Sequence, residues 1–275
     1  MSKINVLSLF DGMSCGRIAL DRLGVDVGKY YASEIDKYAM QIAKKNYPDT
    51  VHLGNVLGVK GENLEPIDLL IGGSPCQGFS SAGKNLNFKD PRSRLFFEYV
   101  RLLKETKPRY FLLENVSMKR EHRDIISNQL GVEPIAINST LVTPQKRLRY
   151  YWTNLPTTPL PQKKYNLKFK GDLGRRVGRR LLNGVRKDYD RTIPIIQRVE
   201  INANPLISNC LTTVAKDNIL VTEGGFKPLG PKDYERLQTV PLGYTEGVSD
   251  TQRLKMLGNG WTVEVIEHLF RGLLQ

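Results

Sequence analysis

The chain has 275 residues, of which 40% are hydrophobic and 25% are charged, as is ordinary for a soluble globular protein. It contains no apolar run long enough to span a bilayer, no secretory signal pattern, and three widely spaced cysteines that form neither a disulfide framework nor a zinc motif. These features predict a reducing, intracellular setting. The net charge of +13 favours nucleic acid or an anionic membrane face as partner, although charge alone does not exclude a merely basic surface.

The first expected strand, residues 4–10, leads through a glycine-bearing turn, residues 11–16, into an expected helix over residues 17–23. A strand, a glycine-rich turn and a helix in this order are typical of nucleotide sites, because glycine lets the backbone approach a ligand closely. The turn lacks the G-x-G-x-x-G spacing of dinucleotide enzymes, which argues against a nicotinamide cofactor. Taken alone, an ordinary turn between a strand and a helix explains these residues equally well.

Two further strands are expected at residues 29–33 and 51–53, with a helix between them. Glu34 follows the first of these strands, where an acid can accept hydrogen bonds from ribose hydroxyls. Asp36 is better explained as an acid at the start of the helix, where the helix dipole favours negative charge. Asn55 follows the third strand and offers an acceptor and a donor suited to an adenine edge. Alternating strands and helices predict an α/β fold with a doubly wound, mostly parallel sheet.

The stretch Gly72-Gly73-Ser74-Pro75-Cys76 follows a short apolar run, residues 67–71, that predicts a buried strand. It therefore reaches the carboxyl end of the sheet, where open α/β sheets bind their ligands. The glycines permit a tight turn, and the proline restricts its own φ angle and the residue before it. A thiol held rigidly at this place is a candidate nucleophile. A lone cysteine is more often buried and structural, but the glycine-proline context and the polar loop that follows reverse that preference.

Residues 80–92 are polar and basic, which predicts a loop over this site. After an expected helix over residues 93–103, an apolar strand at residues 110–113 ends in Glu114. A carboxyl group at the end of a buried strand is costly unless it has partners or a role. On this observation alone, structural and functional interpretations have equal weight.

A strand is expected at residues 135–137, and it is followed by a segment in which Arg147 and Arg149 share one face if the chain is extended. On this alternation alone, a solvated basic edge strand is the better interpretation. Two short strands at residues 209–214 and 218–221 resemble a hairpin.

The composition changes at Pro156, and residues 163–191 contain 11 Lys and Arg residues against 3 Asp. No apolar period supports a helix or a strand there. On composition alone, such a charge run is usually a solvated face, and contact with the phosphates of a nucleic acid is the alternative. Near the end of the chain, a helix is expected over residues 231–238, and Gly258-Asn259-Gly260 forms a turn before a last helix.

Several of these stretches, in this order, resemble the motifs of the DNA cytosine-5 methyltransferases. The matching stretches are Phe10 to Gly16 for the first S-adenosylmethionine motif, Pro75-Cys76-Gln77 for the nucleophile loop, Glu114-Asn115-Val116 for the acid motif, Gln145 to Arg149 for the arginine motif, residues 229–238 for the motif that organises the DNA-recognition region, and Gly258-Asn259-Gly260 for the last motif. The resemblance covers nearly the whole chain. It implies the fold of the class I methyltransferases, S-adenosyl-L-methionine as cofactor and double-stranded DNA as substrate.

The resemblance also implies roles for individual residues. Cys76 would attack C6 of a flipped-out cytosine, Glu114 would act at N3, Arg149 would hold O2, and Arg147 would support the loop. The residues expected to bind the cofactor are Phe10, Asp11, Gly12, Ser14, Gly16, Glu34, Ile35, Asn55, Val56, Pro75, Asn259, Gly260 and Trp261. The residues expected to bind DNA are Ser80, Ser81, Lys84, Arg92, Arg94, Arg175, Arg176, Arg179 and Arg180.

We expect residues 1–155 to form the catalytic and cofactor-binding domain, 156–228 a small target-recognition region, and 229–275 a return to the catalytic domain. Asn55 stands where the family usually has an aspartate. Trp261 and the closing helix resemble the animal de novo branch, whereas Gln77 and Gly258-Asn259 resemble the bacterial and phage branch, which includes restriction-modification enzymes.

Two alternatives stay open. One is a tRNA cytosine-5 methyltransferase of the same superfamily, although the Cys-Phe-Thr signature of that branch is missing. The other is a catalytically inactive DNA-binding homologue, against which the intact Cys76, Glu114 and Arg149 argue. We expect a cytoplasmic, DNA-associated protein of prokaryotic or phage type that binds no metal and no membrane, and we favour a monomer over a homo-oligomer.

Overall fold

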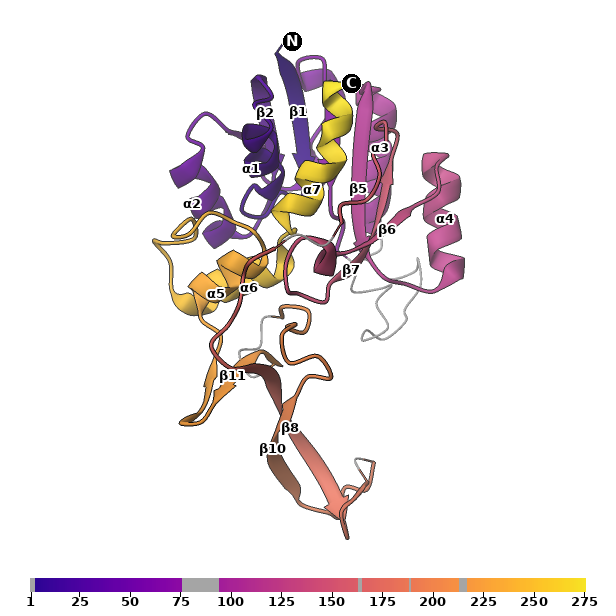
Figure 1. The fold of residues 1–275 in the computed structure, drawn as a ribbon. Coiled ribbons are helices and arrows are strands. Elements are labelled where there is room, and N and C mark those ends of the chain that lie inside the picture. Colours follow the sequence, from indigo (N-terminus) through magenta and orange to yellow (C-terminus); the bar gives the residue numbers. More distant parts are fainter. Residues whose placement is uncertain (1–2, 76–93, 163–164, 188, 213–216) are drawn as a thin grey trace.

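The computed structural model describes residues 3–75, 94–162, 165–187, 189–212 and 217–275. Its larger part is built on a seven-stranded sheet with the order β3-β2-β1-β4-β5-β7-β6 (Figure 1). β1 to β5 are parallel to one another, whereas β7 runs antiparallel to both β5 and β6. These strands are β1 (Ile4–Leu9), β2 (Val27–Ser33), β3 (Val51–His52), β4 (Leu69–Gly72), β5 (Tyr110–Val116), β6 (Ile135–Asn138) and β7 (Leu148–Thr153). The predicted doubly wound, mostly parallel sheet is confirmed.

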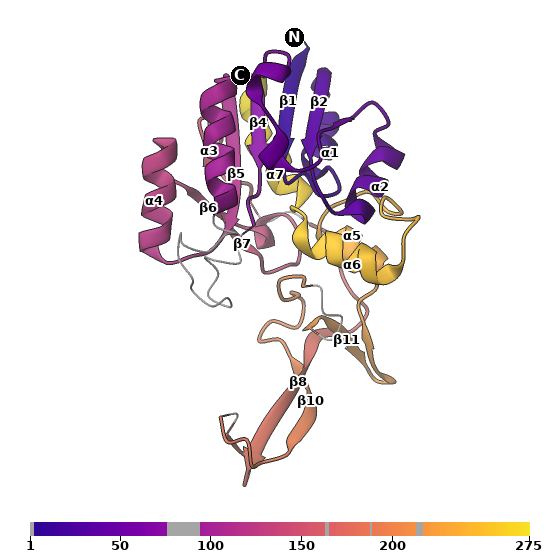
Figure 2. The ribbon, with the colours of Figure 1, turned by 180° about the vertical axis from the view of Figure 1, so that it is seen from behind.

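Helices cover both faces of this sheet, and Figures 1 and 2 view it from the two sides. Successive side chains of a strand point to opposite faces. Accordingly, Val6 and Ile71 are buried in the core that α1, α2 and α7 share, whereas Leu7 and Leu70 are buried in the core beneath α3 and α4. The helices are α1 (Cys15–Arg22), α2 (Lys37–Asn46), α3 (Arg94–Thr106), α4 (Arg120–Leu130), α5 (Pro231–Leu237), α6 (Asp250–Asn259) and α7 (Val263–Phe270). Burial on both faces explains why the central strands are almost continuously apolar.

A second sheet has the order β10-β8-β11-β12, and β9 pairs with the end of β8. Its strands are β8 (Asp172–Leu182), β9 (Val185–Arg186), β10 (Ile195–Ile201), β11 (Ile219–Thr222) and β12 (Gly225–Pro228). Leu173 and Leu220 are buried at its base. β8 and β10 project from there away from the larger part of the molecule (Figures 1 and 2). The sheet therefore joins the body at one end and offers an antiparallel ribbon at the other.

The structure corrects two expectations about this region. Residues 172–182 form an 11-residue strand where the sequence indicates no regular element. Glycines at 174 and 178 and the surrounding arginines hide the strand pattern, and pairing with the distant β10 decides the conformation. The hairpin expected from residues 209–214 and 218–221 is also wrong, because β11 pairs with β12 and with β8 instead.

The sequence also misses two helices, α4 and α6, and the second of them changes the interpretation of the last motif. Gly258 and Asn259 are the final residues of α6, and Gly260 follows as its C-cap, so these residues end one helix as well as preceding another. Within the described parts of the chain, no helix combines the length and the apolar character needed to cross a bilayer.

Candidate active site

The site lies where the carboxyl ends of β1, β2, β4 and β5 meet. Parallel strands bring these ends to one edge of the sheet, and the antiparallel β7 brings its amino end, with Arg149 paired opposite Val116, to the same edge. A cavity of about 560 Å³ opens there. It is lined by residues from the turn after β1, the ends of β2, β4 and β5, and the turn between α6 and α7. Ligands of open α/β sheets bind at such an edge, close to the point where the strand order reverses.

The turn between β1 and α1 forms one wall of this cavity. Phe10, Gly12 and Ser14 have φ angles of 57°, 60° and 66°. A left-handed backbone is uncommon for residues other than glycine and concentrates at functional sites. The carboxylate of Asp11 accepts hydrogen bonds from the hydroxyls of Ser14, Ser8 and Tyr30, which hold the turn in place. Burial raises the pKa of Asp11 to about 6, although those hydrogen bonds act in the opposite direction.

Ser14 and Gly16, both expected to bind the cofactor, do not line the cavity. Ser14 is fully buried and donates to Asp11. A Cβ atom at Gly16 would overlap Cδ1 of the buried Ile71, so a larger residue there would require that side chain to shift where α1 packs against β4. These two residues therefore support the turn without contributing to the cavity wall.

Glu34 and Ile35 line the cavity at the end of β2, beside the turn after β1. One oxygen of Glu34 accepts from the backbone N–H of Gly12 at 2.8 Å, and the other accepts from the N–H groups of Ile35 and Asp36. The side chain of Ile35 is 74% exposed although it is apolar. As predicted, Asp36 is the N-cap of α2, where it accepts from the N–H groups of Tyr38 and Ala39, and it also pairs with Lys255. These bonds lower the pKa of Asp36 in spite of its partial burial.

Asn55 and Val56 lie on the cavity wall beyond β3. The side-chain oxygen of Asn55 accepts from the N–H of Leu57 at 3.1 Å and caps the short 3₁₀ turn Val56–Gly58. The oxygen that the sequence offers to an adenine edge therefore already accepts one hydrogen bond.

Glu114 is the centre of the deeper part of the site, and it is 8% exposed. Its Oε1 is 3.0 Å from Nε of Arg149, and its Oε2 accepts from the indole Nε1 of Trp261 at 3.1 Å. Burial opposes the charge of Arg149, but the Glu114 carboxylate together with Cys210 and Tyr151 outweighs this effect, so the pKa of the guanidinium is raised. Gly73, Ser74 and Pro75 line the cavity beside this pair, and Cys76, the predicted nucleophile, lies outside the described residues.

Arg147 is 4% exposed and holds the last motif. Its guanidinium donates to the carbonyl oxygens of Gly258 and Gly260 at 3.2 and 2.8 Å. Arg147 therefore reaches the turn between α6 and α7 rather than the end of β5, although it also lines the cavity with Asn259, Gly260 and Trp261.

Cys210 is a neighbour of the site that no motif of the sequence indicates. Its Sγ lies 3.4 Å from Nη1 of Arg147 and 3.6 Å from Nη2 of Arg149. The cavity is also lined by residues that were not proposed, among them Cys15, Ser33, Leu57, Leu95, Asn115 and Met256. Asn115 stands within a matched motif, but Met256 lies on α6 and Cys210 is brought in by the second sheet, so no local pattern identifies them.

The residues expected to bind DNA fall into three groups. Ser80, Ser81, Lys84 and Arg92 lie outside the described residues, and Arg94 is exposed at the start of α3. The four arginines at 175, 176, 179 and 180 lie on β8, which projects away from the larger part of the molecule (Figure 1). They are not part of the cavity wall.

A model of the family described as C-5 cytosine-specific DNA methylase matches residues 4–153 and 149–275 of the chain. The type II methyltransferase M1.ScrFI of Lactococcus lactis subsp. cremoris is 30% identical over an alignment that covers the whole chain and 79% of that protein. The orphan methyltransferase M.Rho11sI of Bacillus phage rho11s is 46% identical over 42% of the chain and 24% of its own length. Another, M.SPRI of Bacillus phage SPR, is 36% identical over 62% of the chain and 42% of its length. The matches thus span less than half of both phage relatives.

Solved structures share the whole fold at low sequence identity. A putative DNA modification methyltransferase encoded within an Escherichia coli prophage has a TM-score of 0.70 and 21% identity, with 99% of both chains covered. The Entamoeba histolytica methyltransferase EhMeth has a TM-score of 0.74 and 16% identity, with 100% of this chain and 98% of that chain covered. This likeness confirms the expected fold of the class I methyltransferases.

Proposed function

The chain belongs to the family of C-5 cytosine-specific DNA methylases, and from this premise we propose that it transfers a methyl group from S-adenosyl-L-methionine to C5 of a flipped-out cytosine in double-stranded DNA. The observation that carries the proposal is the position of Glu114. Its carboxylate, held by Arg149, lies on the wall of the same cavity as Glu34 and Ile35, and that cavity is also lined by Pro75, the residue before Cys76 in the sequence.

The chemical difficulty of the reaction explains the residues. C5 of cytosine is a poor nucleophile, and a thiolate that bonds to C6 opens the C5–C6 double bond and makes C5 enamine-like. Cys76 is the proposed thiolate. The negative charge that develops toward N3 and O2 would be met by Glu114, which protonates or hydrogen-bonds N3, and by Arg149 at O2. When a base later removes the proton from C5, the C5–C6 double bond re-forms, the bond between Cys76 and C6 breaks and the thiolate is restored.

The cavity suits the proposed cofactor. Ile35 offers an exposed apolar side chain to a flat base, Glu34 faces the turn after β1, and Gly12 keeps that turn free of a side chain. We propose that these residues, with Asn55, hold S-adenosyl-L-methionine, which supplies an electrophilic methyl group on a sulfonium centre. The proposed target base must leave the stacked duplex to be attacked at C6, at a cost of a few kcal/mol.

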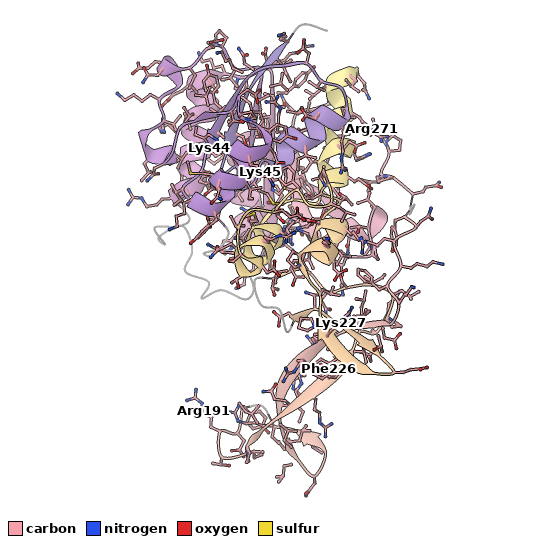
Figure 3. All side chains as sticks on the ribbon, turned by 90° about the vertical axis from the view of Figure 1, so that its left-hand side faces the viewer. Lys44, Lys45, Arg191, Phe226, Lys227 and Arg271 are labelled. Carbon is pink, nitrogen blue, oxygen red and sulfur yellow. The ribbon has the colours of Figure 1, made fainter. Side chains whose placement is uncertain are left out.

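The second sheet is the proposed target-recognition region, within residues 156–228. Its two long strands form an antiparallel ribbon, and the major groove of DNA admits a two-stranded β-ribbon. Arg191, Phe226 and Lys227 lie on this part of the molecule (Figure 3). Positive side chains on such an arm would contact phosphates and release counterions.

The activity can be tested with genomic DNA from cells that express the protein. Bisulfite sequencing should reveal 5-methylcytosine in one sequence context, in DNA from expressing cells and not from control cells. The same purified protein should be incubated with tRNA, DNA and labelled cofactor. Methylated tRNA with unmethylated DNA would contradict the proposed substrate.

The cofactor assignment predicts a thermal shift. S-adenosyl-L-methionine should raise the midpoint of unfolding, because a ligand that binds only the folded state stabilises it. Ile35→Ser should reduce this shift by removing apolar contact with the base. Leu206→Ser is the matched control and should keep the full shift. Leu206 is 65% exposed in the segment that follows β10. Asn55→Asp should change the shift as well. A wild-type midpoint that millimolar cofactor leaves unchanged would refute the assignment.

The ribbon predicts different roles for arginines that look alike in the sequence. Directly paired residues of antiparallel strands share a face, so Arg175 and Glu200 lie on one face and Arg176 and Val199 lie on the other. Glu200 binds Arg175 and Arg179 at 3.0 and 2.8 Å. Its hydrogen bonds to these arginines, the stronger effect coming from Arg179, lower the pKa of Glu200 despite slight burial. Arg176 stacks on Phe226 and has no carboxylate partner among the residues that the structure describes.

Arg176→Gln should therefore weaken DNA binding more than Arg175→Gln. If Arg176 contacts a phosphate, its loss should lower the slope of log affinity against log salt by about one and weaken all sequences alike. If it contacts a base, its loss should cost about 1–3 kcal/mol at one position of the site. The measurement is affinity against salt for both variants, followed by mapping of the methylated context. Equal effects of the two variants would show that Glu200 does not distinguish the two faces.

A further inference from the structure

The two oxygens of Glu114 have partners from opposite sides of the site. Arg149 reaches Oε1 from β7, whereas the indole of Trp261 reaches Oε2 from the turn before α7, 147 residues away in the sequence. The carboxyl group of a glutamate rotates about its last bond with little hindrance. Two donors on different oxygens remove this freedom, so Trp261 contributes to the orientation of Glu114 independently of Arg149.

The indole is itself held between two glycines. A Cβ atom at Gly73 would lie 3.0 Å from both Oε2 of Glu114 and Nε1 of Trp261, and one at Gly16 would lie 3.5 Å from the far edge of the ring. The hydrogen bond therefore passes directly over the backbone of Gly73, three residues before Cys76. A side chain at Gly73 would press on both partners of the bond.

The backbone around Trp261 is fixed as firmly as its ring. The carbonyl oxygen of Gly260 accepts from Arg147 at 2.8 Å and from the side chain of Gln238 at 3.0 Å. Arg149 thus acts on Glu114 by direct contact, whereas Arg147 acts on it through the turn that carries Trp261.

We propose that Trp261 is a positioning residue for Glu114, and that its indole N–H sets the direction in which the carboxyl group meets the target cytosine. This rests on the proposed function, because it assigns a role in the same reaction. The ring also lines the cavity. Trp261 would therefore connect the wall of the proposed cofactor site to Glu114, the group proposed to act on the base. Its N–H should then affect the rate of methyl transfer more than the affinity for the cofactor.

The test separates the N–H from the ring. Trp261→Phe keeps an aromatic surface in the cavity and removes only the donor and part of the ring. Single-turnover methylation at saturating DNA and cofactor should fall on the order of ten- to a hundredfold, as for other small misplacements of a reacting group. The KM for S-adenosyl-L-methionine should change little. Trp152→Phe is the matched control, because Trp152 is buried and loses a comparable bond, from its Nε1 to Ser127 at 3.0 Å, away from the cavity.

A second readout needs no activity. The chain has two tryptophans and hence two indole N–H signals in a ¹H–¹⁵N spectrum, which Trp152→Phe assigns. Glu114→Gln should move the signal of Trp261 and leave that of Trp152 in place. A signal of Trp261 that does not respond would show that the bond is not made in solution and would overturn the proposal.

The kinetic outcomes are equally decisive. A Trp261→Phe variant that methylates at the wild-type rate, or that loses only cofactor affinity, would overturn the positioning role while leaving the proposed function intact. A wild-type protein that methylates no DNA would instead overturn the proposed function. A slow variant with normal KM and a folded spectrum would support the proposal.

Discussion

Replacing Cys76 by serine is expected to abolish methyl transfer, because a hydroxyl group of nearly the same size is far less easily ionised than a thiol and does not add to C6. Folding and binding of S-adenosyl-L-methionine should remain close to those of the wild type. The measurement is a single-turnover methylation assay together with the cofactor-induced thermal shift. Methylation at the wild-type rate would remove Cys76 from the mechanism.

A covalent trap makes this prediction specific to one thiol. DNA whose cytosines carry fluorine at C5 cannot lose a proton from that carbon, so the bond between the thiol and C6 should persist and survive denaturing electrophoresis. The wild type and Cys210→Ser should form this complex, and Cys76→Ser should not. Cys210 is a suitable control because its thiol lies beside Arg147 and Arg149. A complex that disappears with Cys210 instead would reassign the nucleophile.

Glu114→Gln is expected to lower the rate of methylation by about 10²–10⁴-fold, the usual contribution of a positioned acid or base. Glutamine keeps the shape and one acceptor oxygen but carries no transferable proton, and it removes the charge that pairs with Arg149 at 3.0 Å. DNA and cofactor affinities should be largely retained. Single-turnover rates at saturating substrate, with affinities measured separately, decide between an effect on chemistry and an effect on binding.

Loss of an ion pair could also act through stability alone, so a second glutamate serves as a control. Glu98 pairs with Arg101 at 2.7 Å on α3 and is 23% exposed at its side chain. Glu98→Gln removes a comparable pair outside the cavity and should leave the single-turnover rate unchanged. If both variants lost the same fraction of activity, Glu114 would be a structural residue.

Much of the larger sheet can be predicted from the sequence, because its strands carry their signal locally. Ile4 to Leu9 and Leu69 to Gly72 are short apolar runs next to glycine-bearing turns, and their burial on both faces of a parallel sheet requires that composition. The residues that line the cavity can be predicted for a related reason, since the residues after successive parallel strands must meet at one edge of the sheet. Glu34, Asn55 and Glu114 are found in this way.

The second sheet shows where this reasoning stops. β8 alternates glycine with arginine on one face and apolar residues with arginine on the other, so neither face has a continuous apolar pattern. Its conformation depends on pairing with β10 at seven positions, and these partners are not neighbours of β8 in the sequence. The predicted partner of β11 is wrong for a related reason, because pairing among short strands depends on geometry that composition does not encode.

Fold class, motif order and the candidate residues can be predicted from the sequence, since apolar period, turn residues and motif spacing are local properties. Which of those residues meet depends on the packing of the whole chain. Trp261 contacts Glu114, Arg147 holds the turn at Gly260, and Glu200 pairs with two of the four arginines on β8. Each of these contacts joins segments far apart in the chain. Its formation depends on how the sheet edges and helices pack together, and no local pattern in the sequence specifies that packing.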